Sequence, residues 1–370
     1  MCVTTNKKKK HGSNNKNIGL AALQEEERHP DARFHARYPF SSNWPLIPDL
    51  TPPISHVFSA AASYPLIFLA QISTYAWALE KMGKTQSDPV FCSSGALSQG
   101  VVSALVASIS KDDDELVANA VLFTRYMFWH GLRCQTNDLK VAPGSLVASI
   151  GPMLAIQGLS PQVLAKVIEK TNAELRSKSA ATAKAGPALV AAQAELESTS
   201  KLAALHLSLI NGPKQCVVSG RPVALQALKA VVDKMGAQGV SQSRVPFSKR
   251  KPEISTSFLT TASPFHCELN RAAYEQILLD LERLQMHRID LTLRFPVLST
   301  HTGAAVSGDN ILHQIVLMQT CLLADFTRID VPPQVTHVLE FGPGGNDGIG
   351  GAAKYMVSFL FRSLLFRLLL

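Results

Sequence analysis

A chain of 370 residues with 46% hydrophobic and 17% charged residues can bury a sizeable core. A disordered protein is therefore excluded, and the length suits two domains or one core with a large insertion. The formal net charge of +8 lies partly in four lysines at residues 7–10, in a polar stretch typical of a solvated arm, so we do not expect a nucleic-acid-binding protein. Six scattered cysteines without a C-x-x-C pair favour a reducing, cytoplasmic compartment over a disulfide framework or a zinc site.

Neither end of the chain predicts a targeting or membrane segment. The N-terminal lysines are not followed by the apolar stretch of a secretory signal, and we expect residues 1–40 to form a disordered basic tail. Residues 353–370 form an atypical apolar tail, but Arg362 and Arg367 interrupt it. Its apolar part is also shorter than the roughly 20 residues that a membrane-spanning helix needs. We therefore expect no membrane association.

The first folded elements surround a tight turn. Pro-rich residues 43–63 lead into a buried helix that the apolar spacing predicts over residues 64–82. A short apolar strand, a turn centred on Ser98 and a helix of small residues follow within residues 91–109. A second long helix is predicted over residues 115–134, after three aspartates that favour the helix dipole.

The middle of the chain alternates short strands with helices. The predicted elements are a strand at 152–157, a helix at 161–175, strands at 205–211 and 215–219, a helix at 222–235 and a short strand near 243–245. This order is that of the ferredoxin-like split unit. Residues 211–214, with the sequence Asn-Gly-Pro-Lys, supply the hairpin turn between the central strands. The Ala-, Ser- and Lys-rich residues 177–200 are interpreted as an inserted helical or flexible excursion.

The rest of the chain returns to longer elements. We predict a loop at 246–264, a helix beginning near Leu269, a strand region at 291–299, a helix at 311–325 and a buried strand at 336–341, followed by the glycine-rich turn 342–345. The plan is therefore an α/β layer that a smaller α/β unit interrupts and that then resumes.

Ser98 has the surroundings that a nucleophilic serine needs. A strand-to-helix turn flanked by the small residues Ala96 and Gly100 bends sharply and exposes the hydroxyl above the sheet. The backbone amide of Gln99 opens the next helix and points toward an oxyanion formed there. The same pattern also fits a serine in an ordinary turn of small residues, so the presence of a partner histidine decides between the two interpretations.

One of the eleven histidines suits the role of base. His266 lies in a loop just after the inserted unit and just before a helix, from which it could reach Ser98, accept its proton and return it to a leaving thiolate. His206 and His337 fall within predicted strands, where a structural role is expected.

With this pair the sequence resembles the acyl-CoA:acyl-carrier-protein transacylases. More specifically, it is similar to the starter acyltransferase (acetyltransferase) domain of the fungal-type fatty acid synthase beta subunit and its polyketide-pathway relatives. The resemblance runs from about residue 63 to residue 350. The matching motifs are Pro65-Leu66-Ile67 with Gln71, Ser98-Gln99-Gly100, Gly131-Leu132-Arg133-Cys134, Leu209-Ile210-Asn211-Gly212, Val217-Val218-Ser219-Gly220, Ser243-Arg244-Val245-Pro246-Phe247-Ser248, Ala262-Ser263-Pro264-Phe265-His266 and Leu339-Glu340-Phe341-Gly342-Pro343-Gly344-Gly345.

The resemblance implies an α/β fold: an α/β-hydrolase-like acyltransferase core with an inserted ferredoxin-like subdomain, here lacking the family's first strand. The expected divisions are the disordered basic tail at 1–40, the first part of the core with the nucleophile elbow at 41–148, the inserted subdomain at 149–246, the second part of the core at 247–352 and the apolar tail at 353–370.

The resemblance also implies the reaction. Ser98 would be the nucleophile, His266 its base, and the backbone amide of Gln99 an oxyanion donor. An acyl-CoA would acylate Ser98, and the phosphopantetheine thiol of an acyl carrier protein would collect the acyl group. No bound cofactor or metal is implied, and the expected partners are the carrier protein and other fatty acid synthase domains or subunits. The glycine-rich turn 342–345 would orient the His266 ring.

Three further residues bear on substrate choice. Malonyl-selecting relatives place an arginine before the helical glycine, whereas His130 precedes Gly131 here. A neutral histidine is a poor partner for a carboxylate, which favours an uncharged starter such as acetyl. Arg133 lies one helical turn away and could reach the acyl group, or form a structural salt bridge, or contact CoA phosphates. Asn211 would line the cleft, or serve only the hairpin turn.

The sequence departs from the family at three places. Ala96-Leu97 stands where the family has Gly-His, and the family's Gly-Gln-Gly loop, the source of a second oxyanion amide, is not found in residues 1–40. After Gly350 the chain also lacks the expected continuation. We therefore expect a truncated or misassembled gene product, with a free-standing protein as the alternative. A weakly active or inactive fragment that binds a carrier protein or synthase domains is the second hypothesis, and a hydrolase is the third.

Overall fold

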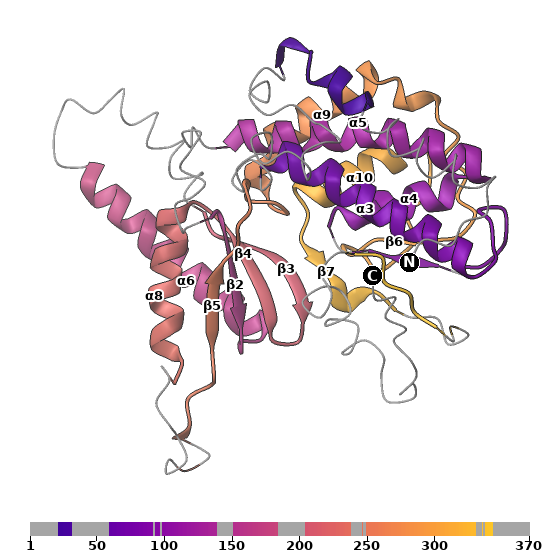
Figure 1. Ribbon diagram of the computed structural model, residues 1–370. Helices are drawn as coiled ribbons and strands as arrows, with labels where there is room; N and C mark the ends of the chain where they lie inside the picture. Colours follow the sequence, from indigo (N-terminus) through magenta and orange to yellow (C-terminus); the bar gives the residue numbers. More distant parts are fainter. Residues whose placement is uncertain are drawn as a thin grey trace, which may run out of the picture.

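The computed structural model describes residues 21–31, 59–91, 93–96, 98–138, 151–183, 204–237, 246, 249–330, 335 and 337–342. These residues form two lobes that lie side by side, one built mainly of helices and one around a sheet (Figure 1). Each lobe has a hydrophobic core of its own. Among the described helices, none is both long and apolar enough to cross a lipid bilayer.

The helical lobe is organised around two long helices. Helix α3 (Ala60–Lys81) packs on α5 (Asp113–Asp138), and a Cβ atom at Gly131 would lie 2.1 Å from the carbonyl oxygen of Ala60. Only glycine therefore permits this approach of the two helices. The lobe also contains α4 (Gly100–Ile109), α9 (Arg271–Arg283), α10 (Ile311–Thr320) and the parallel pair of strands β1 (Ser94–Gly95) and β6 (Val297–Leu298).

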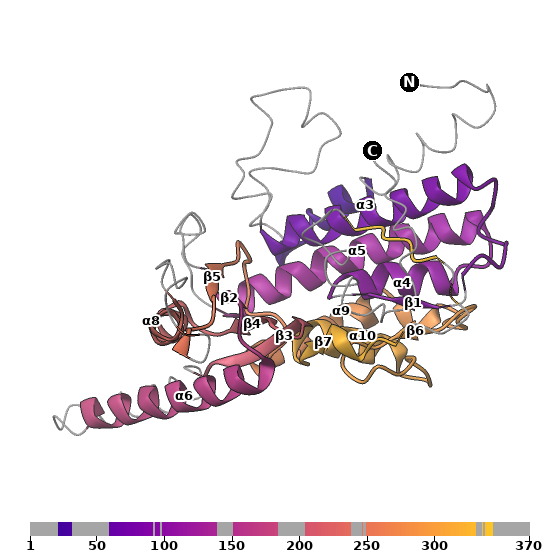
Figure 2. The same cartoon turned by 90° about the horizontal axis from the view of Figure 1, so that it is seen from below.

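The second lobe contains the order of elements that the sequence predicts for the middle of the chain. Its elements are β2 (Met153–Gln157), α6 (Pro161–Ala183), β3 (His206–Gly212), β4 (Gln215–Ser219), α8 (Pro222–Met235) and β5 (Ser255–Phe258). The strands lie in the order β5-β2-β4-β3, with antiparallel neighbours throughout. Helices α6 and α8 lie together beside the sheet (Figures 1 and 2).

The sheet separates the two cores because its side chains alternate between faces. Leu154 and Ile156 of β2 pack in the core that contains residues of α6 and α8. The neighbouring Met153 belongs to the core of the helical lobe. A short strand after α10, β7 (Ala324–Asp325), pairs with β3 in parallel and extends the sheet toward the helical lobe. The two lobes are thus joined through backbone pairing as well as side-chain contact.

The last strand of the sheet is a correction to the sequence analysis. The strand expected near 243–245 lies outside the described residues. Strand β5 occupies residues 255–258, within the segment predicted as a loop, and pairs with β2. Its sequence, Ser-Thr-Ser-Phe, is short and mostly polar because the strand lies at the sheet edge, where one face is exposed.

The predictions for the last third of the chain are also partly wrong. Helix α10 ends at Thr320, and the last two residues of the expected helix form β7. Only Val297–Leu298 is a strand in the region predicted at 291–299. The described residues 337–341 of the expected buried strand have no strand structure, and Val338 is exposed. Of these residues, Phe341 packs against the core of the helical lobe without belonging to a strand.

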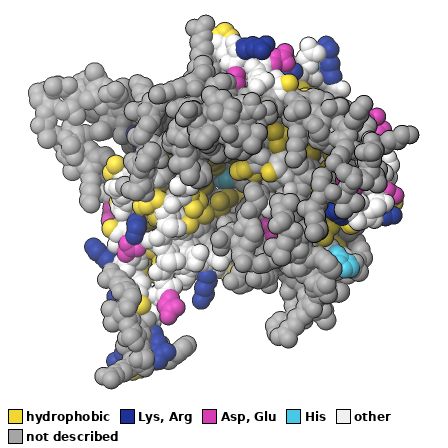
Figure 3. Space-filling view, viewed as in Figure 1, with side chains coloured by type: hydrophobic (Ala, Val, Ile, Leu, Met, Phe, Trp, Pro, Cys, Tyr) yellow, Lys and Arg dark blue, Asp and Glu magenta, His cyan; other side chains and the backbone are white. Residues whose placement is uncertain are grey.

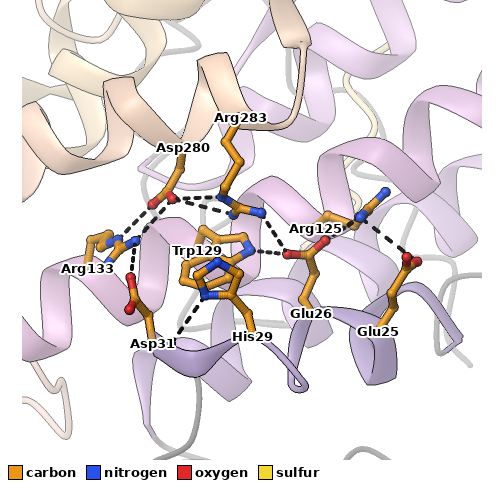
Figure 4. A network of polar contacts seen from close by, with 9 residues as sticks. All are labelled: Glu25, Glu26, His29, Asp31, Arg125, Trp129, Arg133, Asp280 and Arg283. Carbon is orange, nitrogen blue, oxygen red and sulfur yellow. Dashed lines mark hydrogen bonds and ion pairs between the residues drawn. The ribbon is translucent and has the colours of Figure 1, made fainter.

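The N-terminal segment is a further correction. Residues 1–40 were expected to be disordered, yet residues 21–26 form a helix in which Leu23 is fully buried. The carboxylate of Glu26 bonds to Arg125, Arg283 and the indole nitrogen of Trp129, which come from α5 and α9 (Figure 4). Because these partners lie about 100 residues or more along the chain, local sequence patterns do not reveal the segment's place in the fold.

Candidate active site

Ser98 lies in the turn between β1 and α4. Its φ is 53°, in the left-handed region, and α4 begins two residues later at Gly100. The hydroxyl of Ser103 in α4 donates to the Gln71 side chain of α3 over 2.6 Å, which fixes the start of α4 against the core. Leu97, the residue before the serine, lies outside the described residues. The local geometry is therefore a sharp strand-to-helix turn with a polar side chain at its tip.

His266 is the hydrogen-bond partner of Ser98. The distance between His266 Nε2 and Ser98 Oγ is 2.8 Å. His266 Nδ1 lies 2.8 Å from the carbonyl oxygen of Met318 and 3.2 Å from that of Leu322. Because a carbonyl oxygen only accepts, Nδ1 must carry the proton and Nε2 must accept from the serine hydroxyl. The pair is thus arranged for transfer of the serine proton to the histidine.

The surroundings of His266 keep its ring neutral. The side chain is buried, and burial lowers its pKa from 6.5 to about 4, although the bonds to the carbonyls of Met318 and Leu322 act in the opposite direction. On the face drawn in Figure 3, hydrophobic side chains gather near the middle of the molecule. A neutral imidazole is available as a base at physiological pH.

Carbonyl groups at the end of α10 orient the His266 ring. From the sequence, the turn 342–345 was expected to orient it. Residues 343–345 of that turn lie outside the described part of the chain. Met318 and Leu322 act through backbone oxygens, which any residue supplies. No side-chain pattern marks such positions in a sequence, so sequence reasoning had no signal for them.

Gln99 stands at the start of α4, as expected. It has the N-cap position, and its carbonyl accepts from the amide of Val102. Amides in the first turn of a helix have no partner within the helix, so the amide of Gln99 is suited to bind an oxyanion. The side-chain oxygen of Gln99 is buried and has no hydrogen-bond partner in the described structure.

His130 lies in the interior of the helical lobe, on α5. Its Nδ1 is 2.9 Å from the hydroxyl of Tyr126, and its ring stacks on Tyr64 with 5.3 Å between centroids. Burial, and to a smaller extent the proximity of the titratable His266 ring, lower the pKa of His130 from 6.5 to about 3. The ring is therefore neutral. Tyr64 also stacks on Phe265, the residue before His266, with 5.2 Å between centroids, which places His130 in the neighbourhood of the Ser98–His266 pair.

Arg133 is engaged in ion pairs. Its guanidinium bonds to both carboxylate oxygens of Asp280, over 2.7 and 3.1 Å, and to Asp31 over 3.0 Å (Figure 4). It also lies over the ring of Trp129. Of the roles considered from the sequence, this geometry fits a structural salt bridge rather than contact with an acyl group.

Asn211 occupies an irregular position near the end of β3. The pairing of β3 with β4 shifts register between Ile210 and Gly212, a β-bulge that redirects the side chain between them. The Asn211 side-chain oxygen is buried without a hydrogen-bond partner in the described residues. Both the ligand-binding and the hairpin interpretation of this residue are compatible with its placement.

The described part of the chain contains no group of three or more His, Cys, Asp or Glu side chains that could hold a metal ion. The chemistry that the site offers is that of a serine nucleophile with a neutral histidine base and a helix N-terminus beside it.

Residues 21–186 match the family model described as starter unit:ACP transacylase in aflatoxin biosynthesis. The chain belongs to the starter unit:ACP transacylase family. It is 32% identical over 332 residues to the fatty acid synthase beta subunit aflB of Emericella nidulans. It is 30% identical over 317 residues to the fatty acid synthase subunit beta of Schizosaccharomyces pombe. The resemblance inferred from the sequence motifs is therefore confirmed.

These alignments cover 86% and 82% of this chain but only 14% of each relative. The chain thus spans about one seventh of the length of the curated relatives it matches. The match to the family model begins at residue 21, where the described N-terminal helix begins. This segment belongs to the family's domain, although sequence reasoning assigned it to a tail.

Solved structures share the fold. The malonyl CoA-acyl carrier protein transacylase from Clostridium perfringens has a TM-score of 0.59 with 19% identity, over 94% of this chain and 85% of its own. For MCAT from Streptococcus pneumoniae the TM-score is 0.56 with 16% identity, over 93% and 87%. At these identities the likeness shows a common mixed α/β fold and nothing about the substrate.

Proposed function

We propose that this chain is an acyl-CoA:acyl-carrier-protein transacylase that forms an acyl-enzyme on Ser98. The observation that carries the proposal is the 2.8 Å hydrogen bond between Ser98 Oγ and His266 Nε2, with the other ring nitrogen held by carbonyl oxygens. It occurs in a member of the starter unit:ACP transacylase family. The pathway that we propose is the loading of starter units in fatty acid or polyketide synthesis.

In the first half-reaction, His266 accepts the proton of Ser98 as the hydroxyl oxygen attacks the thioester carbonyl. The resulting oxyanion is bound by the backbone amide of Gln99, and one such donor is worth roughly 3 kcal/mol of barrier. When the carbon–sulfur bond breaks, His266 returns the proton to the departing CoA sulfur. A phosphopantetheine thiol of the carrier protein then attacks the Ser98 ester in the reverse sequence of proton transfers, and Ser98 is released.

We propose an uncharged short acyl group, acetyl most of all, as the starter. His130 supports this choice because a buried ring with a pKa of about 3 supplies no positive charge for a carboxylate. The guanidinium of Arg133 is bound to Asp280 and Asp31 and is not available to replace it. A malonyl carboxylate would therefore be buried without a cation, which is strongly unfavourable.

The finer description of the fold belongs to the same proposal. We assign the second lobe to the ferredoxin-like class, inserted into an α/β-hydrolase-like core that lacks the family's first strand. Because β5 pairs with β2, we place the end of the insertion after residue 258 rather than at residue 246. We further propose that the protein acts in the cytoplasm with acyl-CoA, a carrier-protein domain and other synthase domains or subunits, without a bound cofactor.

A binding scaffold is the second candidate. It is favoured by Leu97 beside the serine and by the absence of a Gly-Gln-Gly triplet from residues 1–40, which removes the expected source of a second oxyanion donor. Such a protein would keep the fold and bind a carrier protein or synthase domains without transferring acyl groups.

Incubation with radiolabelled acetyl-CoA separates the candidates. A transacylase becomes labelled on the protein, the label is absent from Ser98→Ala, and an added carrier protein with a phosphopantetheine arm removes it. Absence of label from a folded protein would instead support the scaffold. Release of free acetate without any carrier would indicate a hydrolase.

A further inference from the structure

A buried hydrogen-bonded triad lies next to the candidate catalytic pair. The hydroxyl of Tyr126 is 2.9 Å from Nδ1 of His130 and 2.9 Å from the side-chain oxygen of Gln319. All three side chains are buried. Gln319 directly follows Met318, whose carbonyl binds His266, so the triad is connected to the candidate base through two adjacent residues of α10.

The hydrogen bonds of the triad determine which nitrogen of His130 carries its proton. A carboxamide oxygen only accepts, so the single proton of the Tyr126 hydroxyl is donated to Gln319. The Tyr126 oxygen must then accept from His130, which places the ring proton on Nδ1. A neutral imidazole has only one such proton. His130 Nε2 therefore has a lone pair and no hydrogen.

His130 Nε2 is buried and, among the described residues, has no hydrogen-bond partner. Buried polar atoms are nearly always paired, so an unpaired one beside a candidate active site marks a place where a bound molecule would find a hydrogen-bond partner. The Gln319 side-chain nitrogen is also buried without a described partner. His130 Nε2 can therefore accept a hydrogen bond from a ligand but cannot donate one.

We propose that Tyr126 and Gln319 are positioning residues that fix His130 as a hydrogen-bond acceptor, and that this fixed acceptor excludes acyl groups bearing a carboxylate. The inference rests on the proposed acyl transfer and names the device that sets its substrate class. A carboxylate oxygen facing Nε2 would bring two hydrogen-bond acceptors together with no proton between them. The methyl group of an acetyl thioester needs no hydrogen-bond donor, so it can lie next to Nε2.

The test uses the ratio of Ser98-dependent labelling by malonyl-CoA to that by acetyl-CoA. In Tyr126→Phe, His130 loses the acceptor for Nδ1–H and can carry its proton on Nε2. In Gln319→Met, the hydroxyl of Tyr126 can donate only to His130 Nδ1, which forces the proton onto Nε2. Because a hydrogen bond to a charged group is strong, we expect the malonyl-to-acetyl ratio to rise about tenfold in each variant.

Tyr75→Phe is the matched control. Tyr75 is also buried and donates to a glutamine oxygen, that of Gln86, over 2.7 Å, but neither residue contacts His130 in the described structure. This variant should keep the wild-type ratio. Near-ultraviolet circular dichroism identifies the variants that fold. If only one of Tyr126→Phe and Gln319→Met folds, its malonyl-to-acetyl ratio alone tests the proposal.

Nitrogen NMR of protein with ¹⁵N-labelled histidine reads the proton position directly, with the His130 signals assigned from their loss in His130→Gln. We expect Nδ1–H in the wild type and Nε2–H in Gln319→Met. Nε2–H in the wild type, or an unchanged ratio in a folded Tyr126→Phe, would overturn the inference while leaving serine-dependent labelling intact. If neither acyl-CoA labels Ser98 in the wild type, the proposed function itself fails and this inference falls with it.

Discussion

Ser98 and His266, which are joined by a hydrogen bond of 2.8 Å, both have left-handed backbone conformations, with φ of 53° and 61°. Among the described non-glycine residues only Gln285 shares this feature. Such conformations cost about 1–3 kcal/mol each and persist where the surrounding structure imposes them. The surrounding structure therefore holds both members of the pair in strained backbone conformations, which agrees with a functional role.

This strain predicts a difference between two inactive variants. Ser98→Gly should be more stable than Ser98→Ala by about 1 kcal/mol, because glycine adopts positive φ without a Cβ penalty. Urea unfolding of the two variants measures the difference. Equal stabilities would show that the left-handed turn at Ser98 is not a feature of the folded protein.

The acylation rate should tolerate mild acid. The base form of His266 is the neutral ring, and its pKa of about 4 lies below the ordinary 6.5, so protonation abolishes activity only at lower pH. We expect the rate of serine-dependent labelling to be level from neutral pH to about pH 5 and to fall with an apparent pKa near 4. A midpoint near 6.5 in a protein that remains folded would contradict the buried position of His266.

The stability of the folded protein should also decrease over the pH range of the preceding prediction. His266 and His130 both have lower pKa values when folded, so the unfolded chain binds protons first as the pH falls below 6.5. Stability is therefore lost from about pH 6.5 down to about pH 4 through His266 and down to about pH 3 through His130, by up to roughly 1.4 kcal/mol per pH unit for each histidine. Circular dichroism at each pH separates this loss from protonation of the base.

The ion pairs of Glu26 should stabilise the whole helical lobe. Its buried carboxylate bonds to Arg125, Arg283 and Trp129 (Figure 4), so Glu26→Ala removes the buried partner of Arg125 and one of the two buried partners of Arg283, which keeps Asp280. We expect a loss of about 3 kcal/mol in the free energy of unfolding. The neighbouring Glu25 is exposed and 3.9 Å from Arg125, so Glu25→Ala should cost less than about 0.5 kcal/mol. Similar values for the two variants would show that the N-terminal helix does not dock here.

Two glycines of the family motifs should respond differently to alanine. A Cβ at Gly131 would collide with the backbone of Ala60 at 2.1 Å, so Gly131→Ala must push α3 away from α5 and should cost about 3 kcal/mol. A Cβ at Gly100 would meet the Cβ of Ala96 at 3.4 Å, an ordinary contact, and Gly100→Ala should change stability by less than about 1 kcal/mol. Thermal unfolding of both variants provides the comparison.

Local patterns predicted several elements well. Strand β4 and helix α8 have the predicted bounds because their apolar periodicity and flanking turn residues are strong. Ser98 was recognisable from its small neighbours, and His266 from its place in a loop just after the inserted unit and just before a helix. These features depend on residues that are close together in the sequence.

The rest depends on tertiary contacts that a single sequence does not display. The helix at residues 21–26 is too short to be stable on its own, and it is held by the partners of Glu26 on α5 and α9. Strand β7 has two residues and forms only because β3 offers a free edge. The orientation of His130 depends on Tyr126 one turn before it and on Gln319 nearly 190 residues away, and only the fold brings the three together.

The most direct test of the central claim is peptide mass mapping after a brief incubation with acetyl-CoA and an acid quench. The account predicts one acetyl group on the peptide that contains Ser98, much less of it in His266→Ala, and its disappearance when a carrier protein with a phosphopantetheine thiol is added before the quench. A folded wild-type protein that carries no acetyl group on Ser98, or that carries it equally in His266→Ala, would contradict the account.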